Sequence, residues 1–289
     1  AQYNLKWHQR QSRATQAGSH RRSNDRAASR RSPLTFEMIY QGVHFKLPTI
    51  EAYHFSPDQL KRFLSQGAAV PLTMDLNTSD RCPLRCIYCF TEAGGSDRPD
   101  HEAPDRYGVD ISKDFARLTP EEIREIIRQY AALGGKILFI CSEGEPLMNP
   151  KRFLEYARVA REVGVKVVVF TNMVTVTAEL ARALCAEGVN IVCKLEHLDP
   201  LVNEAILNPK RPLTYVPYRG QMVPQQLVNI LEAYQDHPER LALSSMMTAM
   251  NADGLLDMRR WAYDELGIAH FLKKVYWFGF ANEHKTQLV

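Results

Sequence analysis

The stretch LNTSDRCPLRCIYCFTE, residues 76–92, holds three of the six cysteines of this chain within eight consecutive positions. Cys82, Cys86 and Cys89 follow the spacing C-x3-C-x2-C, which is close enough for their thiols to bind one soft metal centre. Iron–sulfur clusters are held by cysteine thiolates, normally four of them. Three ligands without a fourth nearby would leave one cluster iron open, and an open iron can bind a reactant.

A structural zinc site is the main alternative use of these thiols, and it would require a fourth Cys or His ligand. The nearest candidate is His101, which lies twelve residues after Cys89 in a polar stretch. Three unrelated thiols of a hydrophobic core are a further alternative. The number and spacing of the ligands favour the iron–sulfur interpretation over both.

Residue for residue, this segment resembles the signature loop of the radical S-adenosylmethionine (SAM) superfamily, including the aromatic Tyr88 directly before the last cysteine. The resemblance implies that Cys82, Cys86 and Cys89 hold a [4Fe–4S] cluster, whose open iron takes the amino and carboxylate groups of SAM. It also implies an oxidoreductase-type enzyme, in which one electron cleaves SAM to methionine and a 5′-deoxyadenosyl radical that abstracts a substrate hydrogen. An electron donor such as flavodoxin or ferredoxin would then be a partner, and Tyr88 would lie at the cofactor.

Charge is unevenly distributed along the 289 residues, a length that allows one large α/β domain or two small ones. Residues 1–34 hold eight Lys or Arg and one acidic residue, which leaves 28 basic and 32 acidic residues in the rest. The net charge of +3 therefore reflects the tail and indicates no nucleic-acid surface on the body. No run of 18 apolar residues and no secretory signal is present, so we expect no membrane span. Free cysteines and an iron–sulfur site favour the reducing cytoplasm.

Three segments are expected. Residues 1–34, rich in Arg, Ser, Gln and Ala, are predicted to be a disordered basic tail. We favour a solvated tail or a cloning remnant over a segment that binds nucleic acid or targets the protein. Residues 35–70 form an N-terminal lead-in with a helix over about 56–67, and residues 71–289 form the core. A barrel of the family normally continues after its sixth strand, so we expect the core to be truncated at its C-terminal end.

Strands and helices alternate throughout the core. The predicted strands cover residues 72–76, 137–141, 165–170, 189–195, 241–248 and 270–278. Thr119 and Glu122 form a capping box at the first helix, and Asn251 is predicted to cap the last one, 254–266. Such alternation predicts a parallel α/β sheet with right-handed crossovers. The family resemblance, rather than the alternation, selects a partial (β/α)6 TIM-like barrel over a flat, doubly wound sheet.

The second predicted strand ends in ICSEGEPL, residues 140–147, which resembles the family's GGEP element. Gly144 would let backbone groups come close to a ligand, and the Glu145 carboxylate can accept from an ammonium group. The resemblance implies that Gly144 and Glu145 bind the methionyl amine of SAM, with Ser142 and Glu143 beside them.

The third predicted strand ends in Thr171, Asn172 and Met173, similar to the family's Thr-Asn-Gly turn but with Met in place of Gly. Thr and Asn are also ordinary turn formers. Thr171 and Asn172 are therefore candidates both for cofactor contact and for a purely structural turn.

Polar residues on the fourth and fifth predicted strands complete the candidate site. Strand alternation places Lys194 and Glu196 on the same face. A Lys in an apolar strand is costly unless it is paired or faces a polar cavity, so Lys194 either contacts cofactor or substrate or forms a structural pair with Glu196. Ser244, Ser245 and Thr248 are candidates for the ribose hydroxyls of SAM.

Three cysteines and two long loops remain. Cys141, Cys185 and Cys193 show no cluster spacing and are predicted to be buried core thiols rather than ligands of a second cluster. Residues 91–118 and 208–224 are longer than ordinary connections, so they are either substrate loops or solvated insertions.

A small-molecule substrate, such as a sugar or a natural-product intermediate, is the favoured expectation. The lead-in is short for a peptide-binding domain, no cobalamin-binding domain fits upstream, and no downstream cysteines could hold auxiliary clusters. The alternatives are a maturase of ribosomally made peptides from the same superfamily, a non-catalytic zinc or iron–sulfur protein, and a nucleic-acid-directed protein that uses the basic tail. No residue decides which reaction follows hydrogen abstraction.

Overall fold

The structure is a computed structural model that describes residues 35–40, 43–53, 61, 65, 72–79, 81–91, 118–141 and 143–289. Several predicted features lie outside these residues: the tail 1–34, most of the helix 56–67, residues 92–117 of the first long loop, with His101, and Ser142.

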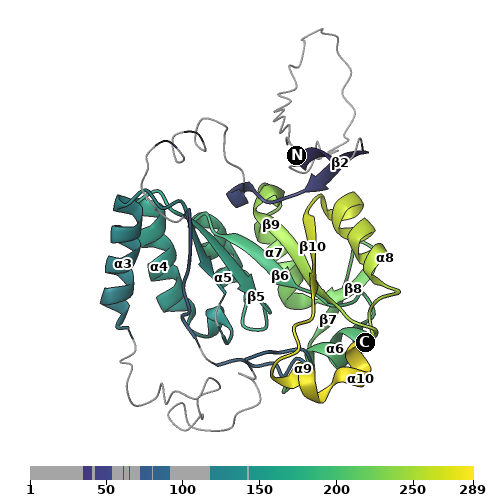
Figure 1. The fold of residues 1–289 in the computed structure, drawn as a ribbon. Coiled ribbons are helices and arrows are strands. Elements are labelled where there is room, and N and C mark those ends of the chain that lie inside the picture. Colours follow the sequence, from purple (N-terminus) through teal and green to yellow (C-terminus); the bar gives the residue numbers. More distant parts are fainter. Residues whose placement is uncertain are drawn as a thin grey trace, which may run out of the picture.

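Six parallel strands form the central sheet (Figure 1). They are β3 (Thr73–Asp75), β4 (Ile137–Ile140), β5 (Lys166–Thr171), β6 (Asn190–Lys194), β9 (Leu241–Met247) and β10 (Ala269–Lys274). Their order in the sheet is the same as their order along the chain. Because the strand order never reverses, the right-handed crossovers place all the connecting helices on one face of a curled sheet. In a doubly wound sheet the strand order reverses, and helices cover both faces of the sheet. The predicted partial barrel, open between β3 and β10, is therefore confirmed.

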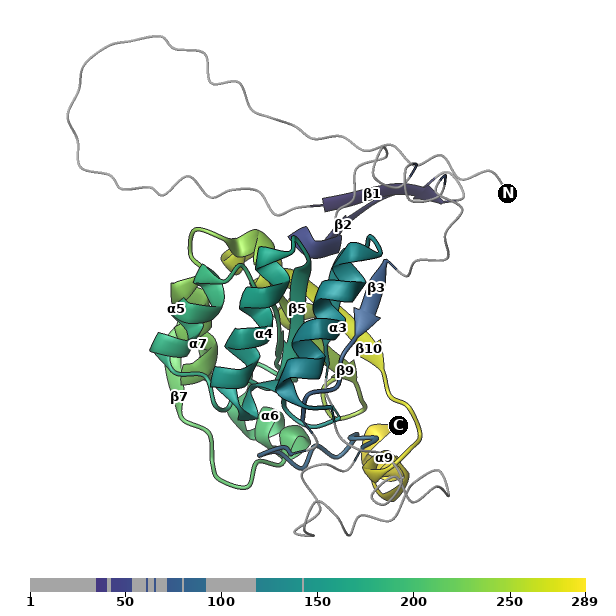
Figure 2. The same ribbon diagram turned by 90° about the vertical axis from the view of Figure 1, so that its left-hand side faces the viewer.

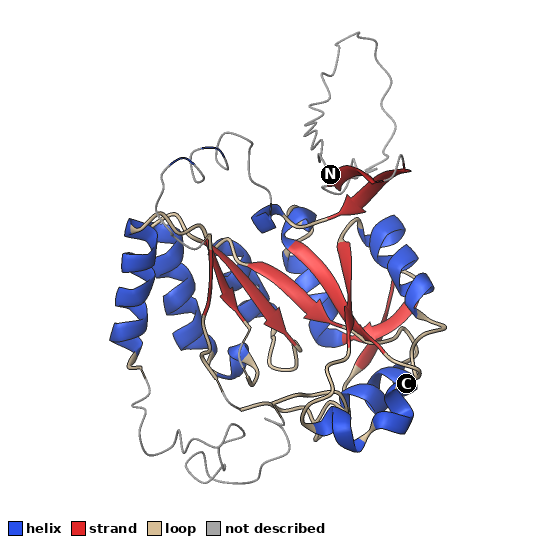
Figure 3. Cartoon of the chain, viewed as in Figure 1, coloured by secondary structure: helices blue, strands red, loops and turns tan. Residues whose placement is uncertain are grey.

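Helices cover the outer face of this sheet, where α3, α4, α5 and α7 lie side by side (Figures 2 and 3). The helices are α3 (Pro120–Ala132), α4 (Pro150–Glu162), α5 (Ala178–Ala186), α6 (Pro200–Leu207), α7 (Gln225–Ala233), α8 (Leu255–Arg260), α9 (Phe280–Glu283) and α10 (Lys285–Leu288). The predicted capping box is present, since Thr119 Oγ1 accepts from the Glu122 amide at 3.2 Å and the Thr119 amide donates to the Glu122 carboxylate at 2.7 Å. No helix in the described ranges is long and apolar enough to cross a membrane.

The second long loop contains a β-hairpin that the sequence analysis missed. Within residues 208–224, β7 (Tyr215–Tyr218) pairs antiparallel with β8 (Gln221–Pro224). Arg219 and Gly220 form the turn with φ of 46° and 79°. Two positive φ values in a two-residue turn are typical of a tight hairpin. Each of these short strands contains a proline, a residue that is rare within strands, so the sequence did not indicate a hairpin here.

One strand boundary was predicted wrongly. The sixth strand ends at Lys274 instead of residue 278, because its neighbour β9 ends at Met247, the register partner of Lys274. The helix predicted over 254–266 is present as α8, followed by a π-helical segment at Trp261–Leu266.

The sheet separates two apolar layers. Residues such as Cys193 and Leu195 pack against the helices, whereas Val192 faces the barrel interior. Ile50, directly before the short 3-10 helix η1 (Glu51–Tyr53), and Ala52, within that helix, belong to the interior cluster. The Ala52 amide also donates to Asn190 Oδ1 at 3.3 Å. The lead-in therefore closes the N-terminal end of the barrel, and polar groups are left at the C-terminal end.

Two of the three cysteines predicted as core thiols are not buried. Cys193 is buried, Cys185 is partly exposed and Cys141 is exposed. Cys141 directly follows β4, at the open C-terminal end of the barrel, which is why the apolar strand before it did not predict its exposure.

The sheet buries one histidine in its neutral form. His270 on β10 is 5% exposed, and its Nε2 lies 2.8 Å from Ser245 Oγ. Burial, with a smaller effect of the Arg259 guanidinium, lowers the pKa of His270 to about 4. An unfolded histidine binds a proton near pH 6.5, so the unfolded chain gains protons first as the pH falls, and stability is lost between about pH 6.5 and pH 4.

We expect His270→Gln to remove part of this acid sensitivity. Between pH 7 and pH 5 the wild-type free energy of unfolding should fall by about 2 kcal/mol more than that of the variant. Urea unfolding at both pH values measures the difference. His237→Gln, which alters a partly exposed histidine, is the matched control and should keep the wild-type pH dependence. An equal pH-dependent loss in wild type and His270→Gln would contradict the assignment.

Candidate active site

The cysteine loop, residues 81–91, follows β3 at the C-terminal end of the barrel, where active sites of such barrels lie. Cys82, Cys86 and Cys89 are all free thiols with intermediate exposure. Beyond the gap at residues 92–117, the chain returns to the sheet through α3.

Backbone hydrogen bonds hold the cysteine loop between α6 and α9. The Arg85 amide donates to the Asn208 carbonyl at 3.0 Å, directly after α6. On the other side, the Phe280 amide at the start of α9 donates to the Cys89 carbonyl at 3.0 Å. A side chain at Gly279 would lie 2.6 Å from that same carbonyl oxygen. The loop is thus positioned by segments far away in sequence.

Gly144 joins the cysteine loop to the Gly-Glu-Pro segment. The Gly144 amide donates to the Ser79 carbonyl and the Glu145 amide to the Arg81 carbonyl, both at 2.7 Å. A Cβ at Gly144 would lie 2.3 Å from the Arg81 carbonyl oxygen. The glycine is therefore required by the backbone of the cysteine loop, which is a reason that the sequence did not reveal.

Glu145 connects the ends of β4 and β5. Its carboxylate is 2% exposed and accepts from Thr171 Oγ1 at 2.6 Å, the Asn172 amide at 2.7 Å and the Leu147 amide at 3.0 Å. Burial raises the pKa of Glu145 to about 7, although the three donors act in the opposite direction. A carboxylate offers about four acceptor positions, so one direction remains for a ligand.

The β5 turn brings Asn172 to the cysteine loop. Asn172 Nδ2 donates to Cys82 Sγ at 3.4 Å, and Thr171 Oγ1 accepts from the Met173 amide at 2.9 Å. Met173 has φ of 66°, the left-handed region that glycine adopts without strain. Its side chain is 2% exposed and packs in the core, which offsets the strained backbone. The departure from the Thr-Asn-Gly pattern thus keeps the glycine-like turn.

Burial disfavours the thiolate form of two of the three cysteines. It is the largest effect that raises the pKa of Cys82 to about 11, and the neighbouring Glu145 and Cys89 raise it further. Burial likewise raises the pKa of Cys86 far above its usual range, although the Lys194 ammonium acts in the opposite direction. A bound metal centre would supply further positive charge, since coordinated thiols are deprotonated outright.

The three loop thiols are the type of donor that an iron–sulfur cluster takes. Such a cluster binds each thiolate through a separate iron, so its ligands are more widely spaced than those of a single ion. Across the described ranges, no group of three or more His, Cys, Asp or Glu side chains is arranged to hold a single metal ion.

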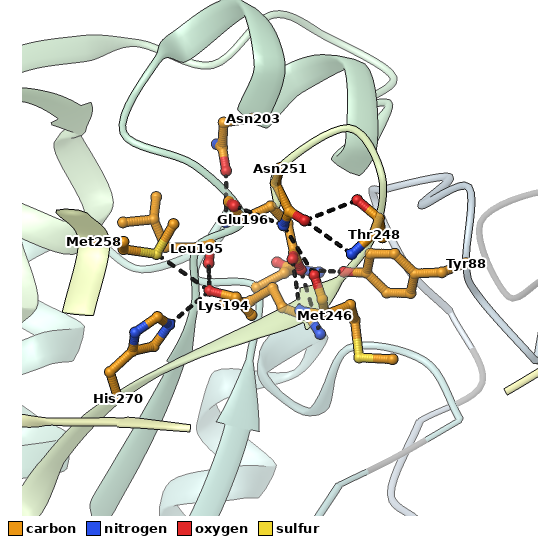
Figure 4. A network of polar contacts seen from close by, with 12 residues as sticks. Tyr88, Lys194, Leu195, Glu196, Asn203, Met246, Thr248, Asn251, Met258 and His270 are labelled. Carbon is orange, nitrogen blue, oxygen red and sulfur yellow. Dashed lines mark hydrogen bonds and ion pairs between the residues drawn. The ribbon is translucent and has the colours of Figure 1, made fainter. Parts of the chain in front are cut away.

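Glu196 is the centre of a second buried polar network, shown in Figure 4. This carboxylate is fully buried and accepts from Tyr88 Oη at 2.6 Å and from the Met246 amide at 2.8 Å. Lys194 Nζ lies 3.5 Å from Glu196 Oε1 and 4.7 Å from the Tyr88 ring centroid. The Lys194–Glu196 pair considered from the sequence is thus present, and Tyr88 connects it to the cysteine loop.

Two asparagines that the sequence analysis did not place here complete the network. Asn203 Oδ1 accepts from the Glu196 amide at 2.9 Å. Asn251 Nδ2 donates to the carbonyls of Glu196 and Met246, both at 2.9 Å, and its Oδ1 accepts from Thr248. The prediction that Asn251 caps the last helix is therefore wrong, because its side chain instead joins β6 to β9. Thr248 is likewise engaged by Asn251 rather than free for ribose.

The two serines of β9 face opposite sides of the sheet. Ser245 Oγ contacts His270 and the Leu195 carbonyl, so it lies on the helix side and away from a ribose in the barrel. Ser244 is 2% exposed, and its Oγ has no hydrogen-bond partner among the described residues. Of this pair, only Ser244 is positioned for a ligand in the barrel.

Comparison with known proteins supports the same assignment. A family model described as "Radical SAM superfamily" matches residues 76–213. The AdoMet-dependent heme synthase of Methanosarcina barkeri is 35% identical over 108 residues, which cover 37% of this chain and 26% of that protein. The PqqA peptide cyclase of Streptomyces rochei is 31% identical over 141 residues, which cover 48% of this chain and 34% of that protein. The chain thus matches about a third or less of the length of these relatives.

A solved structure shows the same fold. The crystal structure of Streptococcus suis SuiB bound to S-adenosylmethionine superposes with a TM-score of 0.50 and 15% identity, over 76% of this chain and 44% of that one. The matched family segment begins at the end of β3 and extends through the cysteine loop to the end of α6 and beyond. The chain belongs to the radical SAM superfamily.

Proposed function

We propose that this chain is an enzyme that holds a [4Fe–4S] cluster on Cys82, Cys86 and Cys89 and uses it to cleave SAM reductively. The observation that supports this most directly is the backbone contact at Gly144, which joins the three thiols and Glu145 in one unit. When bound, the reduced cluster and SAM would together supply a 5′-deoxyadenosyl radical that abstracts a hydrogen atom from the substrate.

The residues of the chain would bind and orient these groups. Glu145 has one acceptor direction left for the ammonium of SAM, and Thr171 holds that carboxylate in place. The donor Asn172 Nδ2 would stabilise negative charge on Cys82 Sγ. Tyr88 fixes the loop through Glu196. We further propose that Lys194 and Ser142 lie against the cofactor, and that Gly144 contributes through the loop backbone. Ser244 faces the same interior and is available either to the ribose of SAM, as expected from the sequence, or to the substrate.

We propose a small-molecule substrate, such as a sugar or a natural-product intermediate, held in the barrel interior. The name of the Streptomyces rochei relative refers to a peptide, so a peptide substrate is the second candidate. Incubation with short precursor peptides encoded near the gene, followed by mass spectrometry, separates the two. An electron donor such as flavodoxin or ferredoxin and a cytoplasmic location complete the proposal.

Anaerobic reconstitution with iron and sulfide, followed by reduction, tests the proposed function. We expect a [4Fe–4S]⁺ electron paramagnetic resonance signal that shifts on addition of SAM, together with formation of 5′-deoxyadenosine. Cys86→Ala should lose both, because it removes one of the three cluster ligands. Cys185→Ala alters a partly exposed thiol on α5 and should retain both. A cluster that does not respond to SAM, or a site that binds only zinc, would refute the enzymatic role.

Gly144→Ala should impair cluster binding even though Gly144 is not a ligand. The new Cβ would meet the Arg81 backbone at 2.3 to 2.7 Å, and relieving such overpacking typically costs about 1–3 kcal/mol. We expect less iron per chain after reconstitution and a lower melting temperature. Gly220→Ala is the control, because its φ of 79° imposes strain while no atom lies within 4 Å. Iron binding equal to wild type in Gly144→Ala would show that the loop does not depend on this contact.

A further inference from the structure

One cation reaches into the barrel interior from its last strand. Lys273 Nζ lies 3.9 Å from the ring centroid of Phe170. Lys273 is on β10 and Phe170 on β5, and two strands, β9 and β6, separate them in the sheet. The contact therefore crosses the barrel and places the ammonium group at its C-terminal opening, where Lys273 is exposed to solvent.

Lys273 has no carboxylate partner in the part of the chain that the structure describes. The nearest influential charges are Lys194, which is positive, and Cys141 and Glu196. Glu196 is already engaged by Lys194, Tyr88 and the Met246 amide. Burial first, and Lys194 second, lower the pKa of Lys273 to about 8. The group thus still carries its proton at pH 7, and among the described residues no carboxylate pairs with it.

A buried hydroxyl without a partner lies near this ammonium. Ser244 is the register partner of both Lys194 on β6 and Phe271 on β10. Lys273 follows two residues after Phe271 and therefore points to the same side of the sheet. Buried polar atoms without a partner are rare in folded proteins, so the unpaired Ser244 Oγ, on the same face of the sheet as Lys273, is available to a ligand that Lys273 also contacts.

We propose that Lys273 and Ser244 form a subsite that holds an anionic group, a carboxylate or a phosphate, of a small-molecule substrate. An ammonium and a hydroxyl both donate to such a group, and the bond to the charged donor is the stronger one. The rings of Phe139, Phe170 and Phe271 pack at the same interior face and suit the apolar part of the molecule. The proposal rests on the proposed function only in assigning the bound group to the substrate.

SAM also carries a carboxylate, so the test must distinguish an anionic group of the substrate from the carboxylate of SAM. The cysteine loop reaches this region through Tyr88, whose ring contacts Lys194. Lys273 lies on β10, at the opposite edge of the sheet from β3, which leads into the cysteine loop. We therefore expect an anion at Lys273 and SAM to bind at the same time.

The experiment titrates the full chain, purified anaerobically, with inorganic phosphate and separately with acetate. Nuclear magnetic resonance of ¹³Cε-labelled lysine follows the Lys273 signal, which is identified by its absence in Lys273→Met. We expect this signal to shift on saturation, with Lys273→Met weakening binding about tenfold or more, the loss expected for one charge-assisted hydrogen bond. Ser244→Ala should weaken it about fivefold, as for a neutral hydrogen bond. Lys274→Met, one residue along β10, is the matched control and should bind as the wild type does.

Each outcome decides the proposal. Tighter binding of phosphate supports a phosphorylated substrate, and tighter binding of acetate supports a carboxylate. The proposal is overturned if neither anion shifts the Lys273 signal, if Lys273→Met binds as tightly as the wild type, or if SAM displaces the anion. The titration of the wild-type chain requires neither the cluster nor SAM, and the spectrum of Lys273→Met is needed only to assign the Lys273 signal. Intact anion binding without formation of 5′-deoxyadenosine would refute the proposed function and leave the subsite standing.

Discussion

The close contact between the backbones of Gly144 and Arg81 determines where the rest of the site can lie. It sets the cysteine loop after β3 directly against the turn after β4, so that two adjacent strand ends act as one piece. Since the Glu145 carboxylate then accepts from Thr171 and Asn172, the end of β5 is fixed to the same piece. The loops that follow β3, β4 and β5 are therefore held together as one surface at the C-terminal end of the barrel.

Two buried carboxylates connect the strand ends at this surface through hydrogen bonds. Glu145 joins β4 to β5, and Glu196 joins β6 to β9 and, through Tyr88, to the cysteine loop. Each carboxylate is almost or fully inaccessible, and each accepts from at least one backbone amide. A buried carboxylate is costly unless it is satisfied by such donors, so both are specified by their surroundings and not by local sequence.

The sequence predicted the features that depend on local pattern. The alternation of strands and helices, the Thr119 capping box and the cysteine spacing are all short-range signals, and the fold they indicated is correct. Features that depend on contacts over long separations were missed or misread. Asn251 resembles a helix cap in sequence, yet its partners are the carbonyls of Met246 and of Glu196, 55 residues away. The close approach of the Arg81 backbone to Gly144 was also not predictable from local pattern, because the two residues belong to different segments.

The same distribution of polar groups explains why the barrel interior is polar at one end only. The lead-in residues Ile50 and Ala52 close the N-terminal end with apolar contacts, so a polar group placed there would be buried without a partner. At the C-terminal end the two carboxylates already have their donors. Among the described residues, Lys273 has no carboxylate partner and Ser244 Oγ has no hydrogen-bond partner. The two residues lie on neighbouring strands and on the same face of the sheet. An interior that satisfies its acids internally and leaves a cation and a hydroxyl unmatched is complementary to an anionic ligand, and this complementarity does not depend on the chemistry that takes place at the cysteine loop.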